Sequence, residues 1–226
     1  MNISDNKDLA NLLFPGLNNT AEDYFELYPQ RNLPEGAKVT RFAPSPTGFV
    51  HIGGLFSALI SERLAHQSGG VFYLRIEDTD KKREIEGGIS GIVNALNNFN
   101  IISDEGFISE NEQIGNYGSY KQSERINIYH AFIKLLIEQE KAYPCFCTNE
   151  ELEELRKQQE VSDIRSGYYG EWAVYRNKSI AEIKTELEKG KTFVIRLKSE
   201  GKSERKVGSH IKPANNKGWR ASRLQC

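Results

Sequence analysis

The sequence has few sulfur-containing residues and no long apolar run. Its 226 residues include three cysteines and one methionine, and its mean hydropathy is −0.58. No stretch of about 18 apolar residues occurs, which argues against a membrane-spanning helix. A small, odd number of cysteines is typical of proteins in a reducing compartment. Residues 1–13 mix polar, acidic and apolar side chains and lack the basic-then-apolar pattern of a secretory signal. We therefore expect a cytoplasmic protein with no membrane partner.

Charge of one sign is not in excess either. The chain carries 30 lysines and arginines against 31 aspartates and glutamates. This balance excludes a chain that binds polyanions over its whole surface, although a local basic face is compatible with it. Hydrophobic residues make up 38% of the chain, which is enough for the core of one large domain or two small ones.

The most informative segment runs from Arg41 to Gly54 and reads Arg-Phe-Ala-Pro-Ser-Pro-Thr-Gly-Phe-Val-His-Ile-Gly-Gly. It contains neither the Gly-Lys-Ser/Thr of a P-loop nor the Gly-x-Gly-x-x-Gly of a dinucleotide-binding fold. It does lie between a predicted strand over 38–43 and a predicted helix over 53–67. That junction is the carboxyl end of a strand, where α/β proteins bind ligands. Glycines permit close backbone approach there, and the helix N-terminus offers N–H groups to a phosphate.

The spacing of apolar residues predicts the order of the elements. Residues 37–117 read as a βαβ unit, which implies a parallel sheet with a right-handed crossover. The first strand and helix are followed by a strand over 71–76 and a helix over 81–99. Because the rest of the sheet is missing, the strand over 71–76 is expected to have an exposed apolar edge. Phe56, Ile60 and Leu64 are expected to line one face of the first helix. The other expected elements are helices over 8–14, 21–28, 123–140, 149–159 and 179–189, and a strand over 192–197.

Two signatures in order connect the chain with a known family. The segment from Arg41 to Gly54 resembles the first signature of class I glutamyl-tRNA synthetases, in which Gly54 replaces the last histidine of His-Ile-Gly-His. Phe72-Tyr-Leu-Arg-Ile-Glu-Asp-Thr-Asp80 resembles a second signature, and the segments 143–147 and 167–172 follow in the family's order. The resemblance covers about residues 20–207.

The resemblance implies an α/β fold that is truncated relative to the family. The expected parts are an N-terminal helical extension (1–36), the first half of a Rossmann-type catalytic domain (37–117), part of a mainly helical α+β acceptor-stem-binding insertion (118–198), and a divergent, disordered basic tail (199–226). The second half of the nucleotide fold, its Lys-Met-Ser-Lys-Ser-like loop and the anticodon-binding domain have no counterpart in the sequence.

The resemblance also implies the reaction of a glutamate–tRNA ligase. ATP, accompanied by Mg²⁺, activates glutamate, which then passes to the acceptor end of tRNA(Glu). Arg41 and Ser45 are implied to hold glutamate, because a guanidinium binds a carboxylate through two hydrogen bonds. Glu77 is implied to bind the ammonium group. From the residues alone, Arg41 and Glu77 fit a salt bridge between neighbouring strands equally well.

The ATP site implied by the resemblance lies at the start of the helix. It consists of Thr47, His51, Gly53 and Gly54, and His51 would be the catalytic donor to the phosphate under attack. Asp78 and Asp80 are interpreted as helix caps before Lys81.

The implied acceptor-stem-binding region offers basic side chains that suit RNA phosphates. The candidates are Arg125, Lys134, Arg156, Lys157 and Arg176, although for each one taken singly the sequence favours a solvated helix face over an RNA contact. We expect the protein to be a monomer.

Cys145 and Cys147 lie where some relatives bind zinc. The window from Tyr168 to Tyr175, where further ligands would fall, contains no cysteine or histidine. Two thiolates do not complete a tetrahedral site, so we expect no metal here.

Three functional interpretations fit the sequence. The first is the amino-terminal part of a glutamate–tRNA ligase, inactive alone. The second is an enzyme of the glutamyl-queuosine tRNA(Asp) synthetase type, which the 36-residue extension and the segment 167–172 argue against. The third is a non-catalytic RNA-binding or pseudogene fragment.

Overall fold

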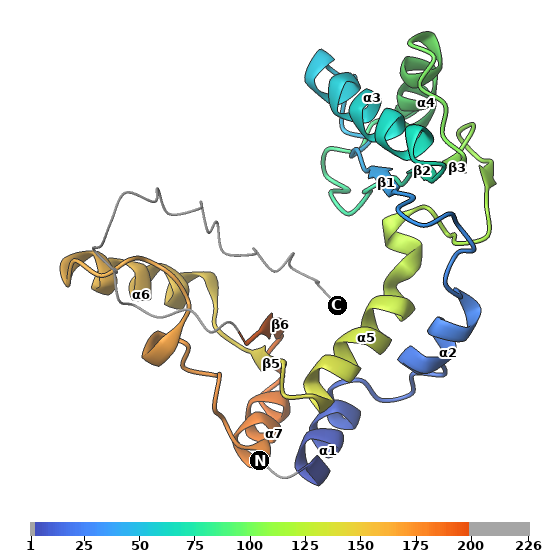
Figure 1. Cartoon of the computed structure of the whole chain (residues 1–226). Helices are drawn as coiled ribbons and strands as arrows, with labels where there is room; N and C mark the ends of the chain where they lie inside the picture. Colours follow the sequence, from blue (N-terminus) through green and yellow to red (C-terminus); the bar gives the residue numbers. More distant parts are fainter. Residues whose placement is uncertain (1–2, 199–226) are drawn as a thin grey trace, which may run out of the picture. The chain divides into compact units, whose positions relative to one another are not determined.

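The computed structural model describes residues 3–198, which divide into two units (Figure 1). Residues 17–131 form what we call the sheet unit. Residues 3–16 and 132–198 form the two-strand unit, and helix α5 (Ile126–Glu138) crosses the border. These borders differ from the predicted domain borders at residues 36 and 117, which stay a prediction. The predicted tail over 199–226 lies outside the described residues.

The sheet unit contains a four-stranded sheet in the order β1-β2-β3-β4. Strands β1 (Val39–Phe42), β2 (Val71–Leu74) and β3 (Glu105–Phe107) are parallel, and β4 (Gln113–Ile114) is antiparallel to β3. Helix α3 (Ile52–Gln67) connects β1 to β2, and α4 (Gly88–Asn98) connects β2 to β3. The predicted βαβ unit and its parallel sheet are therefore confirmed.

The two faces of β2 have different roles because side chains alternate along a strand. Phe72, Leu74 and Ile76 are fully buried in a core with the apolar residues of α3 and α4. Helix α3 packs against β1 and β2 and also contacts α4 (Figure 1). The opposite face carries Tyr73 and the odd-numbered residues that follow it. Arg41 belongs to this second face, because it is paired in register with Tyr73.

The apolar residues of α3 divide between a buried and an exposed face. The buried face contains Leu55, Ala58 and Ala65. The predicted face of Phe56, Ile60 and Leu64 forms, but these side chains remain 64%, 45% and 51% exposed. The expectation of an exposed edge on β2 was wrong, because β2 lies between β1 and β3. Among the described residues, the parallel edge strand is β1.

The predicted helix over 81–99 begins seven residues later, at Gly88. The Ile85 N–H donates to the carbonyl of Pro46 at 3.0 Å, which removes it from any helical hydrogen bond. Gly87 then adopts φ +70° at the N-cap, and a Glu110 carboxylate oxygen accepts from the Ser90 N–H at 2.6 Å. A side chain at Gly88 would meet the Pro46 carbonyl oxygen, so this glycine allows α4 to start against the loop that follows β1.

The two-strand unit is mainly helical around the antiparallel pair β5 (Ala142–Cys145) and β6 (Val194–Leu197). Its helices are α1 (Ile3–Leu13), α6 (Asn149–Val161) and α7 (Ile180–Glu188), with a 3₁₀ turn η2 (Gly170–Trp172). Helices α6 and α7 both begin with capping boxes, Thr148 with Glu151 and Ser179 with Glu182.

The second helix of the predicted extension, α2 (Ala21–Leu27), belongs to the sheet unit. The segment after it is held by Arg31, whose guanidinium binds both carboxylate oxygens of Glu105 on β3. Tyr120 donates a further hydrogen bond to Glu105 at 2.6 Å, and the Arg31 guanidinium lies 3.6 Å from the centre of the Tyr117 ring. The side chains of Arg31 and Glu105 are 16% and 12% exposed.

We expect Glu105→Gln to lower the free energy of unfolding by about 3 kcal/mol, because it leaves a largely buried guanidinium without its partner. Burial opposes the charge of Glu105, but Arg31 and Tyr120 outweigh it and hold the pKa below the ordinary 4.5. This stabilisation is therefore present above about pH 4.5 and is lost as the pH falls through the folded-state pKa. Urea unfolding between neutral and acid pH measures both effects. Arg83→Ala, which breaks the exposed pair with Asp80, is the control and should change little.

Candidate active site

The candidate site lies where β1 and β2 end at the same edge of the sheet. Three backbone hydrogen bonds fasten the loop that follows β1 to the chain that follows β2. The N–H groups of Arg75, Glu77 and Ile85 donate to the carbonyls of Phe42, Pro44 and Pro46, at 3.0, 2.9 and 3.0 Å. Because Pro44 and Pro46 have no N–H to donate, their carbonyls are the groups that join the two segments. The two sequence signatures are thereby held against each other.

Arg41 and Glu77 lie on the same face, as predicted. Arg41 Nη2 is 4.0 Å from Glu77 Oε1, and the two side chains are 41% and 33% exposed. Arg75 Nη2 donates to the same carboxylate oxygen at 2.8 Å and is more buried, with 18% of its side chain exposed. Sequence reasoning missed Arg75, although its position two residues before Glu77 places both on one face of the extended chain.

His51 is the N-cap of α3. Its Nδ1 accepts hydrogen bonds from the N–H groups of Gly53 at 3.1 Å and Gly54 at 3.4 Å. An acceptor needs a free lone pair, so this contact assigns the ring proton to Nε2. The exposed ring can then donate from Nε2 to an anion in solution. The two amides that the sequence predicted as phosphate ligands are already in contact with the histidine.

Ser45 and Thr47 lie on the loop between β1 and α3. Ser45 is exposed and Thr47 is half-buried, and the Thr47 N–H donates to the Ser45 carbonyl at 2.9 Å. The structure therefore brings every predicted site residue to one loop, one helix start and one neighbouring segment. Their roles stay predictions.

Asp78 is not the helix cap that the sequence predicted, since α4 starts only at Gly88. Its buried carboxylate accepts from the Ser123 N–H at 2.9 Å, from the Ser123 hydroxyl at 2.6 Å and from Lys81 at 2.7 Å. Burial opposes the charge, but Lys81 and Ser123 outweigh it and lower the pKa of Asp78. Asp78 thus fastens the 3₁₀ turn η1 (Gln122–Arg125) beside the strand edge.

Of the five basic residues proposed for RNA contact, Arg125 is occupied within the protein. Its Nη1 donates to the carbonyls of Tyr117 and Ser119 at 3.0 and 2.7 Å, which fixes the loop before α5. Arg156 and Lys157 are exposed on α6, while Lys134 and Arg176 are half-buried. Helix α6 is therefore the best-placed of the predicted basic segments.

Cys145 and Cys147 are free thiols beside the hydroxyl of Tyr168. Within residues 3–198, no group of three or more His, Cys, Asp or Glu side chains is placed to hold a metal ion. The donors present do not fit a tetrahedral zinc site. We therefore expect less than stoichiometric zinc in purified protein after dialysis against a chelator, measured by elemental analysis. One zinc ion per chain would contradict this prediction.

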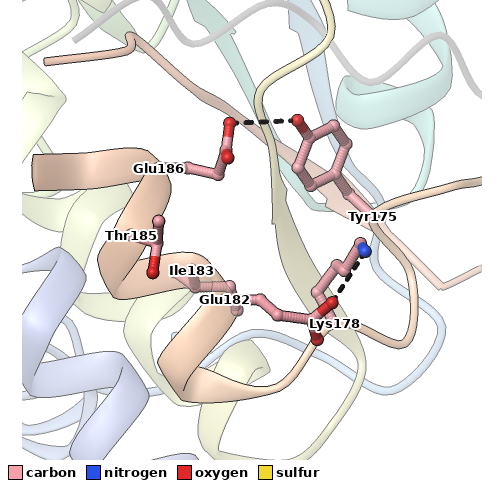
Figure 2. A pocket seen from close by; sticks show the side chains of 6 residues that line it. All are labelled: Tyr175, Lys178, Glu182, Ile183, Thr185 and Glu186. Carbon is pink, nitrogen blue, oxygen red and sulfur yellow. Dashed lines mark hydrogen bonds and ion pairs between the residues drawn. The ribbon is translucent and has the colours of Figure 1, made fainter. Parts of the chain in front are cut away.

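A cavity is present in the two-strand unit (Figure 2). It has a volume of about 200 Å³ and is lined by Tyr175, Lys178, Glu182, Ile183, Thr185 and Glu186. Lys178 holds Glu182, and Lys189 and Lys191 hold Glu186, which lowers the pKa of each carboxyl to about 2. Its charged groups are thus paired with one another, and we assign it no ligand. None of the described helices is long and apolar enough to cross a membrane.

Comparison with known families identifies the family to which this chain belongs. A family model described as tRNA synthetases class I (E and Q), catalytic domain, matches residues 38–213. The chain belongs to this family. The match extends six residues beyond Val207, where we expected the family pattern to stop, and these last residues lie outside the described part.

Similar proteins carry the glutamate-specific name. The chain is 55% identical over 204 residues to the glutamate–tRNA ligase of Clostridium perfringens strain 13, covering 90% of this chain and 37% of the relative. It is 53% identical over 201 residues to that of Acetivibrio thermocellus, covering 88% and 37%. A crystal structure of a glutamate tRNA ligase from Elizabethkingia meningosepticum, in complex with its amino acid, matches 73% of this chain and 32% of that chain with a TM-score of 0.61 and 37% identity. The chain thus spans about a third of the length of these relatives.

Proposed function

We propose that this chain is the amino-terminal part of a glutamate–tRNA ligase, which activates glutamate with ATP and transfers it to tRNA(Glu). The observation that carries the proposal is the pairing of Arg41 and Glu77 at the strand edge, next to the N-terminus of α3. A guanidinium and a carboxylate at this spacing complement the carboxylate and the ammonium of an amino acid.

Glutamate would enter between Arg41 and Glu77. Both side chains are partly exposed and 4.0 Å apart, beyond ordinary hydrogen-bonding distance, so a zwitterion can replace their mutual contact with two closer ones. Arg75 keeps Glu77 oriented through the 2.8 Å hydrogen bond while this exchange takes place. Ser45, on the loop beside them, would add a hydroxyl to the substrate carboxylate.

ATP would place its phosphates at the start of α3, and its Mg²⁺ would arrive bound to phosphate oxygens and water. ATP supplies the α-phosphorus that the glutamate carboxylate attacks, with pyrophosphate as the leaving group. His51 would donate from Nε2 to a phosphate oxygen as charge develops there, and Thr47 would contribute a hydroxyl from the preceding loop. Gly53 and Gly54 hold the ring in this orientation by donating to Nδ1.

The test is a chimera in which residues 1–198 replace the matching part of the C. perfringens relative. At 55% identity the core contacts should be retained, so we expect glutamate-dependent, tRNA-dependent ATP–pyrophosphate exchange. Glutamine in place of glutamate should support little exchange. A folded chimera that activates no amino acid, or prefers another one, would refute the proposal.

Variants of the chimera test the amino acid site. Arg41→Ala and Glu77→Gln should each raise the KM for glutamate by about ten- to a hundredfold, because each removes a hydrogen bond to a charged group. Glu84→Gln is the matched control, since this carboxylate contacts Lys81 rather than the site. An unchanged KM in Glu77→Gln would remove Glu77 from the glutamate site.

A further inference from the structure

Two cysteines of the two-strand unit form a cluster that aminoacylation does not use. Cys145 is the last residue of β5 and is 1% exposed, while Cys147 follows two residues later and is half-buried. The Tyr168 oxygen lies 3.3 Å from Cys145 Sγ and 3.4 Å from Cys147 Sγ. Both sulfur atoms therefore lie around one hydroxyl group.

The residue between the two cysteines fixes their orientation. Phe146 is 2% exposed, and its ring lies 5.4 Å from that of Tyr175 and 5.7 Å from that of Phe193. In an extended chain, residues i and i+2 project to the same side, with Cα atoms about 6.5 Å apart. That separation falls within the range that a disulfide spans.

The cluster also stabilises a thiolate. A hydrogen bond from the Cys147 thiol lowers the pKa of Cys145 to about 5, assisted against burial by Tyr168 and Arg196. The Arg196 guanidinium stacks over the Tyr168 ring at 4.2 Å, and the Tyr168 oxygen also accepts from the Tyr175 N–H at 3.2 Å. This arrangement favours the state in which the two sulfurs share one proton.

We propose that Cys145 and Cys147 form a reversible dithiol–disulfide site that is oxidised by peroxides. The hydrogen bond between the sulfurs lets the proton move to Cys145, so that the more exposed Cys147 attacks. The Cys147 sulfur attacks one peroxide oxygen, the O–O bond breaks, and the departing hydroxide takes the proton from Cys145 to become water.

The second step forms the disulfide bond. The Cys145 sulfur, as thiolate, attacks the sulfenic sulfur of Cys147. The S–S bond forms, the S–O bond breaks, and the departing hydroxide takes a proton from the solvent to become water. One thiol, one thiolate, one peroxide and one proton from the solvent thus give one disulfide and two waters. A thiol reductant reverses the change by exchange.

The experiment uses the 226-residue chain carrying Cys226→Ser, treated with hydrogen peroxide at about pH 6, where an ordinary thiol of pKa about 8.5 is almost entirely protonated. After N-ethylmaleimide quenching, mass spectrometry of the tryptic peptide 142–156 should show two hydrogen atoms lost and no alkylation. Dithiothreitol should restore two alkylatable thiols. Glutathione added to the same reaction should be oxidised by peroxide more slowly than Cys145 and Cys147.

Variants distinguish oxidation promoted by this cluster from the oxidation of any solvent-accessible thiol. Tyr168→Phe should slow disulfide formation about tenfold, because the thiolate loses one hydrogen-bond donor while the stacked ring remains. Tyr169→Phe is the control, since its hydroxyl donates to the Arg165 carbonyl, and its rate should match the parent. Cys145→Ser should stop at a dimedone-reactive sulfenic acid. Two alkylatable cysteines after peroxide treatment, or sulfinic acid without a disulfide, would overturn the proposal.

Discussion

A polypeptide of residues 1–226 alone is expected to show no ATP–pyrophosphate exchange above background, even with glutamate and cognate tRNA. Phosphoryl transfer in this family depends on charged groups that are fixed in place before the reaction. Losing one such donor commonly lowers the rate by roughly two to three powers of ten. The chain spans about a third of its relatives and contains no Lys-Met-Ser-Lys-Ser-like loop, so several donors are missing together.

The structure adds a second reason for the same outcome. The edge of β1 has no partner within the described residues, and Val39 on it is 47% exposed. Phe56, Ile60 and Leu64 expose an apolar face on the neighbouring helix α3. An unpaired edge next to an apolar face favours association between chains, so we also expect concentration-dependent aggregation. We expect weak ATP binding as well, because this polypeptide lacks the second half of the sheet, which would form one wall of the crevice.

Exchange assays and light scattering on the same preparation test both expectations. The chimera with the C. perfringens relative is the positive control, because it supplies the rest of the catalytic domain. Exchange by the 226-residue polypeptide that disappears in His51→Ala would refute the prediction. It would mean that these residues suffice, or that another chain completes the site.

The fold of the sheet unit was largely predictable because its order depends on local patterns. A mostly apolar run marks β2, as is typical of a parallel core strand. The proline-rich loop before the glycine pair marks the start of α3 one residue from its observed position. The start of α4 was not predictable in this way, since it depends on the Ile85 N–H finding the Pro46 carbonyl far away in the sequence. Tertiary hydrogen bonds of this kind override helix propensity.

The sequence was sufficient to predict which residues form the candidate site, but not the hydrogen bonds between them. Register in the parallel pair places Arg41 and Glu77 on one face, which sequence periodicity indicates. The hydrogen bond from Arg75 to Glu77 and the burial of Asp78 depend on side-chain packing. The cap formed by His51 is local, and a histidine two residues before a glycine pair at a helix start could have suggested it.

The contact of His51 with the helix N-terminus allows its two roles to be separated. As the N-cap, the ring satisfies backbone N–H groups that α3 otherwise leaves unpaired. As a proposed catalytic group, the same ring donates from Nε2. Asparagine replaces the first role, because its side-chain oxygen is a good N-cap acceptor, and it has no group where Nε2 lies.

In the chimera, His51→Asn should leave the free energy of unfolding nearly unchanged, while His51→Ala should lower it by about 1 kcal/mol. Both variants should lose about a hundred- to a thousandfold in exchange rate, because both lack the donor to the developing phosphate charge. Urea unfolding and steady-state exchange, measured on the two variants side by side, give the comparison. If His51→Asn kept exchange within a few-fold of the parent, the amides of Gly53 and Gly54 would be the phosphate-binding groups and His51 only their cap.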